Sequence, residues 1–177
     1  MKTIKGFDLV KSITYLILLV IVLLTYKKVG YYANYVIGPT MIIHSIFELI
    51  NGLYYQESKQ KLPIIIAYCA LLVFGVVVTF LNGNDYLVLL CYFWAIWSII
   101  RELNEIAECI ILHDQHIIFI ILDMVESIVC IVFAIILLIN PTLEHLEIHY
   151  ILLVVEFSTT ALFPILNKLI MKKSVEK

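Results

Sequence analysis

Four acidic side chains lie inside long apolar stretches of this 177-residue chain: Glu48, Asp123, Glu126 and Glu156. An ionised carboxylate is unfavourable in a lipid interior, so such residues face the inside of a helix bundle and mark a candidate site. The chemistry open to them is uptake of a proton, or binding of an ion or a cationic ligand. The structural alternative is a neutral carboxyl group that only hydrogen-bonds one helix to the next.

The single arginine of the chain, Arg101, lies in one of the same stretches. With a rise of about 1.5 Å per residue, Arg101 shares its depth with Asp123 and Glu48, and we predict an ion pair with one of them. Glu126 and Glu156 then have no cation, so we expect both to be neutral at pH 7 or to be reached by water. The predicted polar network of the interior consists of Glu48, Arg101, Asp123, Glu126, Glu156, His44 and His149.

Six apolar stretches must position these residues. A bilayer core about 30 Å thick requires about 20 apolar residues in a helix. The chain is 63% hydrophobic and 15% charged, whereas soluble domains are about 45–50% apolar and about 25% charged. We therefore predict one domain, residues 1–177, with an all-α fold: an integral membrane bundle of six transmembrane helices, arranged as three repeated hairpins. The helices are placed at about 9–26, 35–55, 62–81, 86–107, 116–139 and 147–168.

Helical spacing gathers the polar residues of the second, fourth, fifth and sixth stretches onto one face each. The first and third stretches are nearly free of such residues, so we expect these two helices to face lipid more than the other four do. His44 and His149 are expected to be hydrogen-bonding groups between helices rather than metal ligands. Glu102, Glu105 and Glu108 lie near the cytoplasmic end of the fourth stretch, and we expect them to be solvated.

Composition and motifs exclude several classes of function. The net charge of −2 provides no basic surface for nucleic acid. Walker, GxGxxG and HExxH motifs do not occur, so we expect no cofactor and no metal. Ser127 follows Glu126, but adjacent helical residues point to different faces, so we expect no catalytic residues and no enzyme activity. The cysteines form no CxxC pair and are expected to be free buried thiols: Cys69, Cys91, Cys109 and Cys130.

The distribution of lysines predicts the orientation. If the N-terminus is cytoplasmic, nine lysines lie on the inner side and only Lys27 and Lys28 on the outer side. Cytoplasmic loops carry such an excess, so we expect both termini in the cytoplasm of a multi-pass protein. The lipid bilayer is the expected partner, and the basic tail from Lys168 onward would contact anionic lipids. Self-association or a membrane-protein partner stays open. The first and third stretches could supply a lipid-facing surface for it, although neither has a GxxxG motif.

In the region Tyr92–Leu166, an apolar stretch ends in Asn140-Pro141 before another apolar stretch. Together with the segments Ile118–Ser127, Ile136–Pro141 and Val154–Ser158, this pattern resembles the HdeD family of bacterial membrane proteins. The family favours glycine where this chain has Glu126 and Glu156. The resemblance implies six helices in the bacterial inner membrane and a role in acid or envelope stress, and it brings no catalytic residues.

A different class of function stays open. Six helices in fewer than 200 residues also resemble the small substrate-binding subunits of energy-coupling-factor vitamin transporters. Those subunits meet their partner through an AxxxA motif on the first helix. The first stretch here, Tyr15–Leu24, has no such motif. The alternative is therefore a small substrate-binding or transport subunit, and binding of a vitamin would distinguish it.

Overall fold

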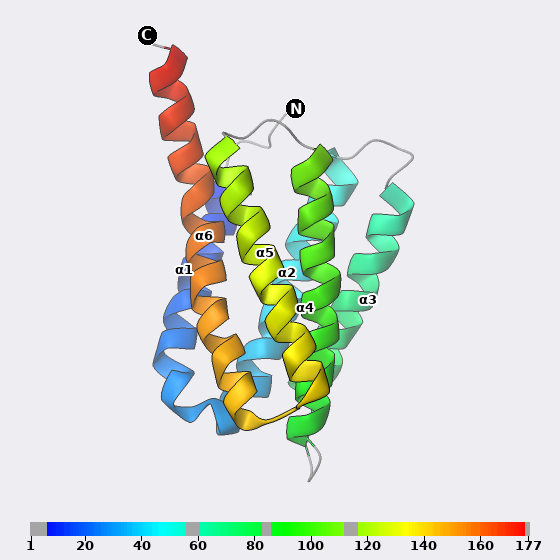
Figure 1. Cartoon of the computed structure of the whole chain (residues 1–177). Helices are drawn as coiled ribbons and strands as arrows, with labels where there is room; N and C mark the ends of the chain where they lie inside the picture. The colour runs from blue at the N-terminus through cyan, green and yellow to red at the C-terminus, as the bar shows by residue number, and fades with distance from the viewer. Residues whose placement is uncertain (1–6, 56–60, 83–85, 112–116, 176–177) are drawn as a thin grey trace.

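The structure is a computed structural model that describes residues 7–55, 61–82, 86–111 and 117–175 (Figure 1). Within these ranges the fold is all-α, as predicted, and contains no strand. Six α-helices follow one another, with one short 3-10 turn after the first. The elements are α1 (Phe7–Thr25), η1 (Tyr26–Lys28), α2 (Val29–Tyr55), α3 (Lys61–Thr79), α4 (Tyr86–Ile111), α5 (Ile117–Ile139) and α6 (Leu143–Val175).

Several of these helices are suited to a membrane. By length and composition, three helical segments of the described residues are able to cross one: Leu9–Leu53, which contains α1 and α2, then Tyr86–Ala107 and Ile120–Ile139. A shorter apolar helix covers Ile65–Thr79 in α3. The first half of α6 carries three glutamates and two histidines, and α6 is not among these segments. The six predicted helices are thus present, and membrane crossing is supported for fewer than six.

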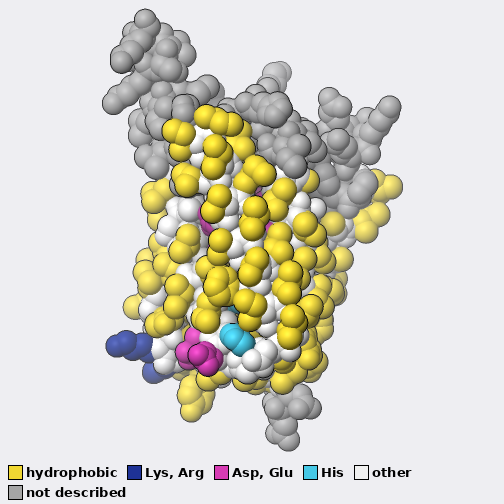
Figure 2. Space-filling view, viewed as in Figure 1, with side chains coloured by type: hydrophobic (Ala, Val, Ile, Leu, Met, Phe, Trp, Pro, Cys, Tyr) yellow, Lys and Arg dark blue, Asp and Glu magenta, His cyan; other side chains and the backbone are white. Residues whose placement is uncertain are grey.

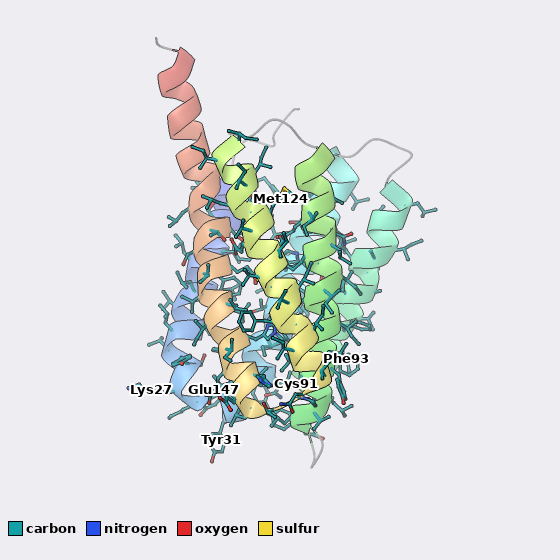
Figure 3. All side chains as sticks on the ribbon, viewed as in Figure 1. Lys27, Tyr31, Cys91, Phe93, Met124 and Glu147 are labelled. Atoms are coloured by element: carbon teal, nitrogen blue, oxygen red, sulfur yellow. The ribbon has the colours of Figure 1, made fainter. Side chains whose placement is uncertain are left out.

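The helices alternate in direction. Helices α2, α4 and α6 run one way through the bundle, and α1, α3 and α5 run the other way (Figure 1). The start of α1 and the end of α6 consequently lie at the same end of the molecule. Lys27 and Glu147 both lie toward the opposite end, whereas Met124 of α5 lies in the half nearer the start of α1 (Figure 3).

The closest helix pairs differ from the predicted hairpins. We expected the first helix to pair with the second, the third with the fourth and the fifth with the sixth. Instead α3 packs most extensively on α2, α5 on α4, and α1 on α6. Loop lengths alone did not distinguish the two arrangements. A middle helix is joined by a short connection to the helix before it and to the helix after it, so it can pack more closely on either one.

Two glycines allow the close approach of α2 and α3. A Cβ atom on Gly38 would lie 2.7 Å from the backbone nitrogen of Thr79, and one on Gly75 would lie 2.9 Å from the nitrogen of Ile42. Small residues let helix backbones approach in this way. Asn34 closes the end of the interface, because its amide donates to the carbonyl oxygen of Leu81 at 3.2 Å.

Apolar side chains cover most of the outer surface that Figure 2 shows. Exposed residues of this kind follow the outward faces of α1 and α5; they include Ile13, Ile17, Val20 and Leu24, and Ile121, Val125, Ile128 and Val132. Soluble monomers rarely expose a contiguous apolar patch larger than a few hundred Å². The arrangement is that of a protein whose outer solvent is apolar, with its polar groups turned inward. The membrane character inferred from composition is therefore supported by where the side chains lie.

Candidate functional site: a buried ionic cluster on α4 and α6

Arg101 is the centre of a buried ionic cluster. It is 1% exposed and projects from α4. Its guanidinium donates from Nη1 to Glu156 Oε1 on α6 and from Nη2 to Glu102 Oε1 on α4. Nε lies 3.4 Å from Glu105 Oε1, one turn further along α4. The guanidinium carbon also lies 5.0 Å from the ring centroid of Trp97, a cation–π arrangement that suits a planar cation.

The predicted pairing of Arg101 with Asp123 or Glu48 is wrong. Arg101 bonds to Glu156, which we had expected to have no cation. The prediction compared depths along the helix axes and not directions around them, so it could not tell which helix faced α4. Asp123 is half-buried on α5 and makes no ion pair with Arg101 among the described residues.

Glu48 belongs to a second, separate ion pair. Its Oε1 accepts from Lys11 Nζ of α1 at 2.7 Å, and its Oε2 accepts from the Asn51 amide at 3.2 Å. The first helix exposes an apolar face, as expected of a more lipid-facing helix, but it also contributes Lys11 and Tyr15 to the interior. Their spacing of four residues, which places both on one helix face, is the signal that could have found them.

His44 lies between the two ion pairs. Its Nδ1 is 2.7 Å from the hydroxyl oxygen of Tyr15, in a buried hydrogen bond from α2 to α1. On its other side, the imidazole meets the Trp97 ring at a centroid distance of 5.3 Å and an angle of 79°. The predicted role of His44 as a hydrogen-bonding group between helices is confirmed. Because the Trp97 ring contacts both His44 and the guanidinium of Arg101, it joins the Tyr15–His44 hydrogen bond to the Arg101 cluster.

His149 also bonds between helices, as predicted, but two helical turns away from the ionic cluster. The indole Nε1 of Trp94 donates to His149 Nδ1 at 3.2 Å. Trp94 and Trp97 stack at 5.1 Å, so the two α4 rings join this contact to the Arg101 cluster.

Helix α5 adds the carboxyl group of Glu126 and the thiol group of Cys130 near the cluster. Glu126 Oε1 accepts from the Thr159 hydroxyl of α6 at 3.0 Å, which fits a hydrogen-bonding role for this carboxyl. Ligand atoms of Glu102, Cys130 and Glu156 lie within 4.8 Å of one another. The guanidinium of Arg101 already bonds to both of those carboxylates, so a metal ion would have to compete with it, and we assign none.

Two further expectations are corrected. Glu102 was expected to be solvated, but it is 1% exposed because it turns back into the bundle toward Arg101. Glu105 is 40% exposed at its side chain, in agreement with partial solvation. Cys91 and Cys130 are buried free thiols as expected, whereas the free thiol of Cys69 is exposed on α3. The side chains of Glu108 and Cys109 lie outside the described part of the structure.

Acidic groups outnumber basic ones in this interior. The carboxyl groups are Glu48, Glu102, Glu105, Glu126 and Glu156, and the cations near them are Lys11 and Arg101. Lys11 serves Glu48, so one guanidinium faces the remaining four carboxyl groups. Burial of an ionised carboxylate without a cation carries a desolvation penalty of roughly several kcal/mol. The arrangement is suited to holding protons on carboxyl groups or to attracting a cation.

Comparison of the chain with protein-family models, with curated proteins and with solved structures found no match.

Proposed function

We propose that the chain is a multi-pass bacterial inner-membrane protein of HdeD type, whose buried carboxyl groups take up and release protons as the pH of the cell envelope changes. The observation that supports this most directly is the excess of carboxyl groups around Arg101. The resemblance to the HdeD family covers Tyr92–Leu166, and this region contains the residues of α4, α5 and α6 that build the cluster. The role is in acid or envelope stress and involves no catalysis.

The proposed mechanism is electrostatic. At neutral pH the guanidinium of Arg101 holds Glu156 of α6 and Glu102 of α4 together. Protonation of Glu156 removes the negative charge that this ion pair depends on, so the contact between α4 and α6 weakens. Within the described part of the chain, Glu126 bonds to the Thr159 hydroxyl and to no cation, so it is the carboxyl group best placed to store a proton without breaking an ion pair.

The test is acid survival of cells that carry a Glu126→Gln, Glu156→Gln double variant. Glutamine keeps the shape and a hydrogen-bond acceptor but does not titrate in this range. Survival at acid pH should change relative to the original chain. The matched control is Glu144→Gln with Glu147→Gln, because these two carboxyl groups are exposed on the first turns of α6. Unchanged survival in the first variant, at equal protein levels, would remove the support for an acid-related role.

A spectroscopic measurement addresses the proton directly. Infrared spectra of the purified protein in lipid, taken across a pH series, report protonated carboxyl groups. We expect a protonated carboxyl band at neutral pH that Glu126→Gln removes. The same variant should leave the thermal unfolding temperature nearly unchanged, since the glutamine amide oxygen still accepts from Thr159.

A further inference from the structure

Three buried polar atoms at the α2–α4 interface have no hydrogen-bond partner among the described residues: Thr40 Oγ1, His44 Nε2 and Trp97 Nε1. Their residues are 1%, 5% and 0% exposed. Buried polar groups are paired with protein or with ordered water in the great majority of cases, and leaving one unpaired is unfavourable. Three such atoms on two neighbouring helices call for hydrogen-bond partners other than the described side chains.

The three atoms lie along one short stretch of the interface. The rings of His44 and Trp97 meet at a centroid distance of 5.3 Å. Thr40 precedes His44 by four residues, so the two side chains share a face of α2. One turn beyond Trp97, the Nε atom of Arg101 is also buried without a hydrogen bond to any described residue, and it lies 3.4 Å from Glu105 Oε1. The unpaired atoms thus lead from α2 to the edge of the ionic cluster.

The hydroxyl of Thr40 differs from other hydroxyl groups in these helices. Ser45, Thr79 and Ser158 each donate to the carbonyl oxygen four residues earlier, at 2.7 to 2.8 Å. Thr40 makes no such bond, although threonine hydroxyl groups in helices commonly reach that carbonyl. Its hydroxyl group is therefore free to bond to something that is not part of its own helix.

The chemistry of the three atoms selects the ligand. The indole of Trp97 only donates, and a threonine hydroxyl donates or accepts. Because Tyr15 occupies Nδ1 of His44, Nε2 either donates or accepts according to the tautomer. An anion is disfavoured, since carboxyl groups of Glu48, Glu102 and Glu156 lie near Arg101 and His44. A neutral molecule that both donates and accepts satisfies all three atoms.

We propose that ordered water molecules occupy the α2–α4 interface and hydrogen-bond to Thr40, His44 and Trp97. This water extends the Tyr15–His44 hydrogen bond toward the guanidinium of Arg101, so that α1, α2 and α4 share one hydrogen-bonded path. The water site stands on the geometry of these residues and does not depend on the HdeD-type function.

The first test is Thr40→Val in the full chain in lipid nanodiscs, with thermal unfolding as the readout. Valine has the shape of threonine but cannot bind water. If water bridges Thr40 to its neighbours, the unfolding temperature falls by about 2–4 °C. An unchanged or raised unfolding temperature would show a hydroxyl group that was unpaired, and would overturn the proposal. The control is Thr14→Val, because the Thr14 hydroxyl bonds within α1 to the Val10 carbonyl at 2.9 Å.

The second test uses the fact that the chain has only two tryptophans. Ultraviolet resonance Raman spectra distinguish a hydrogen-bonded indole N–H from a free one. A Trp94→Phe variant leaves Trp97 as the sole reporter, and we expect its N–H to be hydrogen-bonded. Trp97→Phe leaves Trp94, which donates to His149, as the positive control. A free Trp97 N–H, or one directed only at the face of the His44 ring, would overturn the proposal even if Thr40→Val were destabilising.

Discussion

Arg101 and Glu156 are joined by an ion pair across 55 positions of the chain, and Trp94 and His149 are joined by a hydrogen bond across the same 55 positions. A constant offset of this kind means that α4 and α6 run parallel and in register. The two contacts are seven residues apart on each helix, which is about two turns or about 10.5 Å. A hydrophobic contact alone would not fix the register so strictly, because apolar side chains tolerate sliding by one residue better than a buried ion pair does.

Removal of the central cation should be the most destabilising single change in the bundle. Arg101→Leu leaves Glu156 and Glu102 buried without their partner, and we expect a loss of about 3–5 kcal/mol in the free energy of unfolding. The measurement is reversible unfolding in mixed detergent, followed by circular dichroism. Glu105→Gln is the control and should change stability by less than about 1 kcal/mol, because Glu105 is partly solvated. Equal effects of the two variants would contradict the central position of Arg101.

The Lys11–Glu48 pair gives a second prediction with a matched control. Lys11→Met preserves the length of the side chain and removes its charge, so Glu48 keeps only the hydrogen bond from Asn51. We expect a lower unfolding temperature for this variant. Lys27→Met, on the exposed η1 turn, should have little effect. If both variants unfold at the temperature of the original chain, the ion pair between α1 and α2 does not contribute to stability.

The sequence predicted the helices and the type of most interior contacts but not their partners. The length of an apolar run depends only on the residues of that run. The residue types alone therefore sufficed to place six helices. The partner of Arg101 depends on how α4, α5 and α6 are rotated about their axes. Depth alone placed Asp123 and Glu48 closer to Arg101 than Glu156, and the three-dimensional arrangement shows that Glu156 is the partner instead. The error over Glu102 has the same origin, since the residue is near a helix end but points inward.

The role of α1 was underestimated for a related reason. Lys11 looks like one of the basic residues that flank a first membrane helix, and the positive-inside rule explains such a residue without any partner. The carboxylate that it meets is 37 positions away on α2, and no local pattern connects the two. His44 and His149 could be predicted as hydrogen-bonding groups because neutral imidazole in an apolar helix requires a partner whichever helix supplies it.

The orientation of the bundle in the membrane gives a third prediction. The start of α1 and the end of α6 lie at one end of the molecule, and Lys27 lies at the other (Figures 1 and 3). From the excess of lysines near both termini, we expect the end that holds the start of α1 to face the cytoplasm. A C-terminal fluorescent-protein fusion should fluoresce, while a C-terminal alkaline phosphatase fusion should be inactive. The opposite pair of results would reverse the predicted topology.

The contact of α2 with α3 gives the fourth prediction, because three glycines there and nearby differ in the space around them. Gly38→Ala and Gly75→Ala each place a methyl group within 3 Å of backbone atoms on the facing helix, so the helices must separate. We expect a loss of about 1–3 kcal/mol for each. Gly30→Ala is the control, since its new methyl group would meet only the Leu143 side chain at 3.7 Å, an ordinary contact. Alanine also favours the helix over glycine, so Gly30→Ala should be neutral or stabilising. If Gly38→Ala were as well tolerated as Gly30→Ala in thermal unfolding, the close approach of α2 and α3 would be wrong.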